Sequence, residues 1–385
     1  MMKALALYVH VPFCARKCDY CDFASWAGRE LQWQIYFDAL EAEIRRWSEI
    51  TDFGLLSEQY SIKSLFIGGG TPTLVPATYI EEIIQRCRGI AEFEPGAEVT
   101  IEGNPGTVSI EKLAVYARAG INRISLGAQS FDDGLLKSLG RIHTAAQIEQ
   151  AVDMAREAGF SNINLDLMYA LPGQTMEQWM DTLDHAIALG VPHISAYSLI
   201  VEAGTPMAER VLNGMAVLPD DETVNAMQRA ATKKLTKTGY GRYEISNYAK
   251  PKSECRHNLT YWRRGDYLGL GCAAHSLLGG CRFHNPETLD GYLPGGGIED
   301  VQRLTRLDAM EETVMLSTRT TRGLDLERWR VEFGEDFMER RASSVGMLIN
   351  AGLVEKTEGF LHCTERGLEV QNAVVQALLN ERGNR

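Results

Sequence analysis

The 385-residue sequence lacks several features that would place it in a specialised class of protein. No uninterrupted apolar run approaches the roughly 18 residues that a membrane-spanning helix needs, so we do not expect an integral membrane protein. The N-terminal stretch MMKALALYVHVPFC has a lysine and a short apolar segment but no small-residue cleavage site, which argues against a signal peptide. No internal repeat or low-complexity stretch is visible. We therefore predict a globular, cytoplasmic protein.

Positive charge is also scarce. The formal net charge is −12, which argues against a nucleic-acid partner bound through its phosphates. Hydrophobic residues make up 45% of the chain and charged residues 23%, as is ordinary for a globular protein. The length suits one large domain with a smaller one, or about two to three modest domains.

A second cluster of paired cysteines is missing as well. Three of the eight cysteines, Cys14, Cys18 and Cys21, fall within CARKCDYC, a spacing that indicates metal binding in a reducing compartment. A structural zinc site usually takes four ligands in two pairs, and His10, in a strand-like run just before Pro12, would have to supply the fourth. A cluster of four irons held by three thiolates leaves one iron open to a small molecule. We favour this iron–sulfur interpretation.

Short apolar segments alternate with helical patterns over the first 200 residues, which predicts parallel βαβ units. Such units wind into an open sheet or a barrel, with the ligand at the carboxyl ends of the strands. The predicted strands are 4–11, 62–68, 98–105, 123–129, 162–170 and 193–200, and the predicted helices are 31–48, 76–90, 109–119, 145–158 and 176–189.

Polar or glycine-rich residues follow several of these strands. GGGTPT at 68–73 is neither a Walker A sequence nor G-x-G-x-x-G, so a phosphate site has no support, and by itself the run indicates only a tight turn. An isolated polar residue in a strand is usually a hydrogen-bonded barrel residue. Several at consecutive strand ends predict a polar site, and these are Glu102, Gln129, Arg141 and Asp166.

The stretch YVHVPFCARKCDYC resembles the cluster loop of the radical S-adenosylmethionine (SAM) superfamily, whose CxxxCxxC binds a 4Fe-4S cluster. GGGTPT, E-x-N-P, LGAQSF, LDLMYALPGQT and YLGLGCAAHS extend the resemblance over nearly the full length. They are similar to the oxygen-independent coproporphyrinogen III dehydrogenases and the related HemW heme chaperones. The resemblance implies a partial (β/α)6 barrel of the TIM type.

The resemblance also implies site residues. Cys14, Cys18 and Cys21 would hold the cluster, with SAM on its open iron, and Tyr8 would lie against the cluster or SAM. The protein would bind and orient these groups, which carry the chemistry. The remaining implied SAM contacts are Gly69, Gly70, Thr71, Glu102, Gln129, Arg141 and Asp166.

Two features separate the subfamilies. The dehydrogenases have CxxxCxxCxC and an N-terminal extension, whereas Phe23 stands here at the place of the fourth cysteine and the cluster begins at residue 14. Residues 257–262 read HNLTYW, the HNxxYW motif associated with heme in HemW-type proteins. His257 is therefore the implied heme contact, although a loop with only local hydrogen bonds is the alternative. Less favoured ligands are Cys255, His275 and His284.

We predict two domains. Residues 1–300 would form the barrel, with an extension at its mouth over about 240–300 that carries HNLTYW. Residues 301–385 read as helices and a hairpin, which predicts a winged-helix-like domain. Because this part has 12 Lys and Arg against 14 Asp and Glu, we interpret it as a lid or a protein-interaction module and not as a nucleic-acid binder.

The resulting hypothesis is a heme chaperone that hands heme to acceptor proteins, supported by a SAM-coordinated 4Fe-4S cluster. Candidate partners are heme-accepting proteins, among them membrane-bound respiratory proteins, and a second copy of the chain. The competing hypothesis is an enzyme of porphyrin biosynthesis that decarboxylates coproporphyrinogen III. A radical SAM enzyme with an unrelated substrate is the third, and whether SAM is cleaved stays open.

Overall fold

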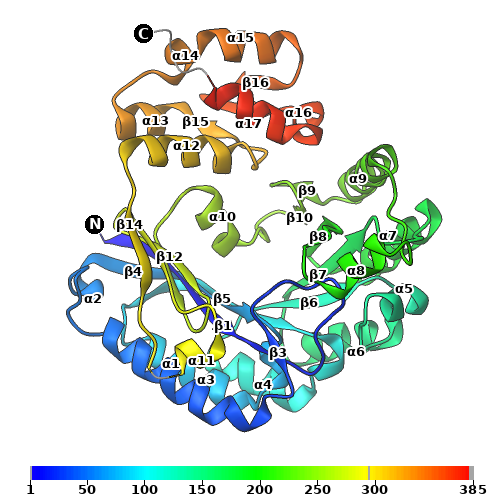
Figure 1. The fold of residues 1–385 in the computed structure, drawn as a ribbon, viewed down its shortest axis with the longest axis vertical. Coiled ribbons are helices and arrows are strands. Elements are labelled where there is room, and N and C mark those ends of the chain that lie inside the picture. The colour runs from blue at the N-terminus through cyan, green and yellow to red at the C-terminus, as the bar shows by residue number, and fades with distance from the viewer. Residues whose placement is uncertain (1, 294, 381–385) are drawn as a thin grey trace.

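A sheet of 12 strands runs through the residues that the computed structural model describes, which are 2–293 and 295–380. Six parallel strands form its centre and helices cover the outer face (Figure 1). The first and last of the six pair with other strands and not with each other, so the barrel is open. The predicted α/β fold is confirmed. The six strands are β1 (Lys3–Val11), β4 (Tyr60–Gly69), β5 (Phe93–Gly103), β6 (Arg123–Gln129), β7 (Asn162–Tyr169) and β8 (His193–Ser198).

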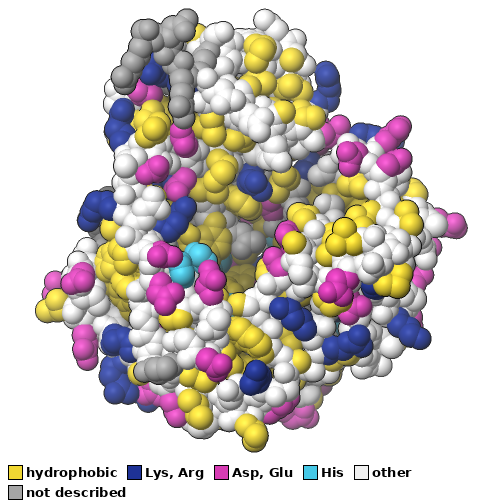
Figure 2. Space-filling model, in the orientation of Figure 1, with side chains coloured by type: hydrophobic (Ala, Val, Ile, Leu, Met, Phe, Trp, Pro, Cys, Tyr) yellow, Lys and Arg dark blue, Asp and Glu magenta, His cyan; other side chains and the backbone are white. Residues whose placement is uncertain are grey.

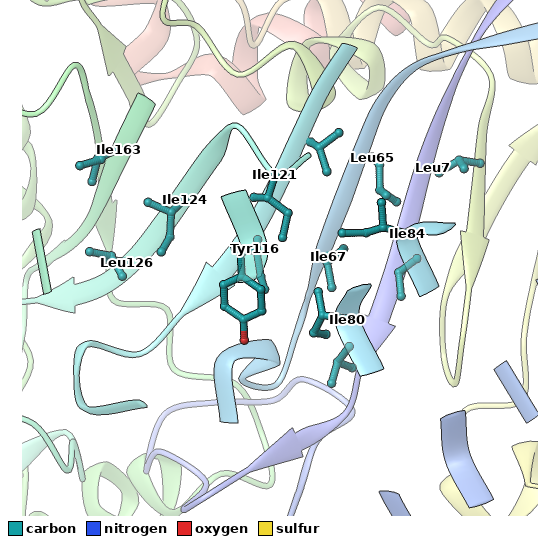
Figure 3. Packing of buried hydrophobic residues seen from close by; sticks show 14 of the residues in the cluster. Leu7, Leu65, Ile67, Ile80, Ile84, Tyr116, Ile121, Ile124, Leu126 and Ile163 are labelled. Carbon is teal, nitrogen blue, oxygen red and sulfur yellow. The ribbon is translucent and has the colours of Figure 1, made fainter. Parts of the chain in front are cut away.

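Alternate residues of these strands face opposite sides of the wall. Figure 3 shows Leu65 and Ile67 of β4 on the same side as Ile80 and Ile84 of the neighbouring helix, and all four are buried. Burying each such side chain stabilises the fold by about 1.5–3 kcal/mol. The other set of positions faces the interior of the barrel and is polar. It includes Glu102, Arg123, Ser125, Asn164, Asp166 and Ser195.

The predicted helices all form, and local signals set their ends. Thr144 and Thr175 each accept a hydrogen bond from the third residue of the following helix, whose Gln side chain bonds back to the cap. Such capping contributes about 1 kcal/mol per helix. The helices are α1 (Trp33–Trp47), α3 (Ala77–Cys87), α4 (Ile110–Ala119), α6 (Ala145–Glu157) and α7 (Met176–Ala188).

The segment predicted as a mouth extension, 240–300, lengthens the sheet at both edges, which the sequence pattern did not indicate. One short antiparallel pair joins β8, and four strands continue the sheet from β1. Between these two additions lies helix α10 (Arg256–Trp262), which carries HNLTYW. The strands are β9 (Gly241–Arg242), β10 (Asn247–Ala249), β11 (Tyr267–Leu270), β12 (His275–Leu278), β13 (Cys281–His284) and β14 (Glu299–Arg303).

The C-terminal helices share a hydrophobic core of their own, around Trp329, Phe333 and Phe337. A predicted hairpin is present, and its turn residues Glu358 and Gly359 both have positive φ. β14 spans the predicted division at residue 300. The elements are α12 (Arg306–Ser317), β15 (Leu324–Asp325), α13 (Leu326–Phe333), α14 (Phe337–Arg340), α15 (Ala342–Asn350), β16 (Val354–Thr357), β17 (Phe360–Cys363), α16 (Glu365–Glu369) and α17 (Gln371–Leu379).

The C-terminal helices stand above α10, at the end of the barrel (Figure 1). Figure 2 shows that the surface is hollowed between these helices and the barrel, with hydrophobic and basic atoms near the upper edge of the hollow. Among the described residues, no helix combines the length and apolar composition that crossing a membrane requires.

Candidate functional site

The cysteine loop follows β1 and is fixed to the glycine run after β4. Gly70 N donates to Val11 O across 2.9 Å, and Thr71 N donates to Phe13 O across 2.7 Å. A Cβ on Gly70 would lie 2.7 Å from Phe13 O, so this approach requires glycine. Gly69 has a φ of +110°, which favours glycine as well. GGGTPT therefore serves as the support of the cysteine loop.

Side chains from distant segments reach the thiols of this loop. Thr71 Oγ1 donates to Cys14 Sγ across 3.7 Å, and Arg141 Nη1 donates to Cys18 Sγ across 3.3 Å. Within the loop, Cys21 N donates to Cys18 O across 3.2 Å. The structure thus brings two of the predicted SAM contacts to the predicted cluster ligands. Hydrogen bonds to thiolate sulfur are among the means by which a protein tunes a bound iron–sulfur cluster.

The zinc alternative concerns His10 together with the three loop thiols. Within residues 2–293 and 295–380, no three His, Cys, Asp or Glu side chains are close enough to hold one metal ion. His10, considered as a fourth zinc ligand, is buried, and its Nε2 lies 2.8 Å from Ala24 O. A carbonyl only accepts, so Nε2 carries the proton and Nδ1 accepts from Tyr8 Oη at 2.9 Å. His10 therefore orients the loop and Tyr8.

Phe23 stands two positions after the last loop cysteine, with 60% of its side chain exposed. Its carbonyl oxygen accepts from Lys17 Nζ at 2.9 Å and from Ser25 Oγ at 3.3 Å. The backbone at this position is held by local hydrogen bonds, while the ring lies in solvent.

A cavity of about 170 Å³ opens inside the barrel beside this loop. We call it the barrel cavity. Its wall combines strand residues with one face of α10. The lining residues are Tyr8, Phe66, Glu102, Arg123, Ser125, Asn164, Asp166, Ser195, Tyr197, His257, Asn258 and Tyr261.

Two carboxylates of the barrel cavity are held by short hydrogen bonds. Gly69 N donates to Glu102 Oε2 across 3.1 Å. Asp166 accepts from Ser125 Oγ at 3.0 Å and from Asn164 Nδ2 at 2.8 Å. Burial, and then the nearby Asp166, raises the pKa of Glu102 to about 7, and burial also raises the pKa of Asp166. Both side chains are placed to accept hydrogen bonds from hydroxyl or ammonium groups of a ligand.

Gln129 is the last residue of β6, and Arg141, in the segment after α5 (Asp133–Ser138), reaches the same strand with its side chain. Gln129 has a φ of +66° and is only 8% exposed, so its backbone is held in a conformation that few residues adopt. Arg141 Nη2 donates to Gly127 O across 2.6 Å, and a Cβ on Gly127 would lie 3.1 Å from both the Gln129 and Arg141 side chains. This backbone approach positions the guanidinium that reaches Cys18.

His257 is 1% exposed and projects from the first turn of α10 into the barrel. Its Nδ1 lies 3.0 Å from Ser64 Oγ and its Nε2 lies 2.8 Å from Tyr261 Oη. The ring also stacks on Phe66 with centroids 5.1 Å apart. Burial, and then the charge of Arg123, lowers the pKa of His257 to about 3, so the imidazole is neutral. Both ring nitrogens have a hydrogen-bond partner within the chain.

Comparison with known proteins places this geometry in a family. Residues 8–186 match the model of the radical SAM superfamily, and residues 304–370 match the HemN C-terminal domain. The chain is 37% identical to the heme chaperone HemW of Haemophilus influenzae, over 99% of each chain. It is 34% identical to that of Lactococcus lactis, over 98% of each. The chain belongs to the HemW family of heme chaperones.

The fold of this HemW-family chain also matches a solved structure. Coproporphyrinogen III oxidase (HemN) from Escherichia coli, described as a radical SAM enzyme, superposes with a TM-score of 0.84 at 25% identity. The match covers 98% of this chain and 91% of the other. Membership of the radical SAM superfamily implies a 4Fe-4S cluster and SAM.

Two charged residues near the site of this HemW-family chain were not predicted from the sequence. Glu98 is 3% exposed and accepts from the backbone N–H groups of Arg256 and His257, each at 3.0 Å. Arg123 is 1% exposed and lines the barrel cavity, where its Nε and Nη1 have no hydrogen-bond partner among the described residues. Their signal was the alternation of polar residues along β5 and β6, as in Glu98, Thr100 and Glu102.

Cys255, one of the less favoured heme ligands, is not among the residues that line the barrel cavity. The buried Cys255 thiol is 3.5 Å from Glu98 Oε1, and burial raises its pKa to about 12. His275 and His284 pair with each other across β12 and β13, with ring centroids 5.0 Å apart. Neither histidine lines the barrel cavity.

Proposed function

We propose that this chain binds heme and transfers it to acceptor proteins, and that a 4Fe-4S cluster with bound SAM supports this role. The observation that carries the proposal is the similarity to curated heme chaperones over nearly the whole length of both chains. Membrane-bound respiratory proteins are the acceptors we propose, and a second copy of the chain is a further proposed partner.

The contacts around the cysteine loop support a division of roles. Cys14, Cys18 and Cys21 would hold the cluster, and Arg141 and Thr71 would donate hydrogen bonds to its sulfur ligands. Bound together, the cluster and SAM supply redox chemistry, and the chain binds and orients them. The proposed SAM contacts are Tyr8, Gly69, Gly70, Thr71, Glu102, Gln129, Arg141 and Asp166.

His257 remains the proposed heme contact. Its hydrogen bonds in the structure show which contacts must break before heme can bind to it. Because Nε2 already bonds to Tyr261 Oη and Nδ1 to Ser64 Oγ, heme iron can reach the imidazole only if one of these bonds is given up. The low pKa of His257 favours this role, because a metal binds the neutral imidazole. Movement of α10 away from the barrel would free Nδ1 from Ser64, whereas freeing Nε2 requires the Tyr261 side chain to turn away, because Tyr261 lies on α10 as well.

The test is an anaerobic heme titration of the reconstituted protein, with wild type beside His257→Ala and Tyr261→Phe. We expect saturable binding near one heme per chain in the wild type. His257→Ala should weaken binding and alter the heme absorbance spectrum, because an axial ligand is lost. Tyr261→Phe frees Nε2 without removing the imidazole, so it should bind heme at least as tightly as the wild type.

Failure of the wild type to bind heme would overturn the chaperone proposal. Conversion of coproporphyrinogen III under the same conditions would then be measured, because the solved HemN structure shares this fold. If both heme binding and that conversion fail while SAM is cleaved, an unrelated substrate is indicated. Normal heme spectra in His257→Ala would remove only the assignment of that residue.

A further inference from the structure

A second, larger cavity lies on the other side of α10. It measures about 500 Å³, within the range of roughly 300–1,000 Å³ that is usual for small-molecule sites. Its wall is shared between α10 with its flanking segments and the C-terminal elements from α12 to β17, so we call it the interdomain cavity. The residues on which the argument depends are Trp262, Arg263, Arg322, Asp325, Arg328 and Phe360.

Helix α10 separates the two cavities, and HNLTYW contributes to both. His257, Asn258 and Tyr261 line the barrel cavity, whereas Leu259 and Trp262 line the interdomain cavity. This division follows from the helical repeat, because residues three and four apart share a face. The apolar face of the motif, which suits a porphyrin ring, is therefore presented to the interdomain cavity.

The wall of the interdomain cavity carries three arginines and three carboxylates, whereas the chain as a whole has a net charge of −12. Two of the three carboxylates have partners. Asp325 accepts from the backbone N–H of Arg328 at 2.9 Å, and Glu332 accepts from both Arg264 and Arg328. The arginines of the wall are Arg263, Arg322 and Arg328, and its carboxylates are Glu254, Asp325 and Glu332.

Two of these arginines are available to a ligand. Neither Arg263 nor Arg322 has a carboxylate partner among the residues that the structure describes. The Arg322 guanidinium lies 4.3 Å from the centre of the Phe360 ring. Burial, and then the charges of Arg322 and Arg328, lowers the pKa of Arg263. Guanidinium groups that repel one another are stabilised when an anion enters between them.

We propose that the interdomain cavity receives the porphyrin with its two propionate carboxylates on Arg263 and Arg322, while Trp262 and Phe360 contact the ring. This assignment rests on the proposed heme binding but not on His257 as a ligand, because His257 lines the barrel cavity on the other side of α10. The two arginines without a carboxylate partner match in number the two carboxylates of the ligand. Arginine pairs with carboxylate through two parallel hydrogen bonds, so it fixes the orientation of the ligand as well as its affinity.

The test compares heme with iron protoporphyrin IX dimethyl ester, in which the propionates are uncharged. We expect the full-length wild type to bind heme at least tenfold more tightly than the ester, because charge-assisted hydrogen bonds are lost with the ester. The double variant Arg263→Gln, Arg322→Gln should bind heme at least tenfold more weakly. Its affinity for the ester should stay within about twofold of the wild-type value.

Arg330→Gln is the matched control, because Arg330 lies on α13, pairs with Glu327 and is absent from the cavity wall. It should bind both porphyrins as the wild type does. The variant Arg263→Lys, Arg322→Lys keeps both charges without the planar fork, and it should retain part of the preference for heme.

The outcomes separate this inference from the proposed function. If the wild type binds heme but does not discriminate against the ester, the propionate assignment is wrong and heme binding stands. The same conclusion follows if the double variant, with an unchanged thermal unfolding midpoint, binds heme as tightly as the wild type. If the wild type binds neither porphyrin, the proposed function fails and the assignment fails with it.

Discussion

The two cavities on either side of α10 differ in the elements that build them. The barrel cavity is enclosed by parallel strands whose inward residues are buried and hydrogen-bonded, with about 170 Å³ of space. The interdomain cavity, of about 500 Å³, lies between α10 with its flanking segments and the C-terminal elements, which have a hydrophobic core of their own. Strands hold ligand groups in fixed positions, whereas two separately packed bodies can change their separation. The fixed barrel cavity is therefore suited to a permanently bound cofactor, and the adjustable interdomain cavity to a ligand that is released.

The largest effect should follow from removing a thiol beside the barrel cavity. We expect Cys18→Ala to abolish the iron–sulfur absorbance after anaerobic reconstitution, because only three thiols are available in the loop. Iron and sulfide content are measured with it. Cys363→Ala, in the C-terminal core, should keep a full cluster. A complete cluster in Cys18→Ala would show that the ligands lie elsewhere.

The next largest effect concerns the attachment of α10 to the barrel. Glu98→Ala removes the acceptor of two backbone N–H groups and one of the nearby negative charges that act on the buried Arg123. The expected loss is about 3–5 kcal/mol of the free energy of unfolding, measured with urea. Glu94→Ala, on the same strand and bonded only to Ser61, should cost about 1 kcal/mol or less. Equal losses would contradict the anchoring role.

SAM affinity should respond next. Asp166→Asn removes a charged acceptor from the barrel cavity, which we expect to cost about 1.5–3 kcal/mol of binding free energy, or roughly ten- to a hundredfold in Kd. Iron content should stay at the wild-type level. Parallel loss of iron and of SAM binding would indicate misfolding, and unchanged SAM binding would remove Asp166 from the site.

The pH dependence of stability tests the environment of Glu102. Its pKa rises from 4.5 to about 7 on folding, so between these values the folded chain keeps a proton that the unfolded chain has released. The free energy of unfolding of the wild type should therefore fall as the pH rises from about 4.5 to 7. In Glu102→Gln this fall should be shallower, as measured by urea unfolding at a series of pH values. An equal slope would show that Glu102 titrates normally.

The smallest effects compare neighbouring residues of HNLTYW. Tyr261→Phe leaves Nε2 of the buried His257 without its partner at 2.8 Å, at an expected cost of about 1 kcal/mol. Trp262 Nε1 has no hydrogen-bond partner among the described residues, so Trp262→Phe costs only packing. Thermal unfolding of both variants measures the difference. A larger loss in Trp262→Phe would mean that the interdomain side is the more tightly held.

The sequence was sufficient for the barrel because its signals are local. The six strands and five helices show alternation and helical periodicity over neighbouring residues, and the cysteine triplet is contiguous. Contacts between segments that are distant in the sequence could not be predicted from it. Nothing near residue 257 shows that Glu98 bonds to its backbone N–H, or that Arg123 lowers the pKa of its ring. For the same reason, the sequence did not predict that residues 240–300 add strands at both edges of the sheet, because a strand's pairing partner is not encoded locally.

The two ends of α10 are attached to different bodies. Its first turn is bonded to Glu98 inside the barrel, whereas just beyond its last turn Arg263 O accepts from Arg328 of α13 at 2.9 Å. If the C-terminal helices moved away from the barrel, the end of α10 that carries Trp262 would move with them. The end that carries His257 would stay in place. The helix would then pivot about its first turn, so that Trp262 changes its distance from the barrel while the backbone of His257 keeps its bond to Glu98.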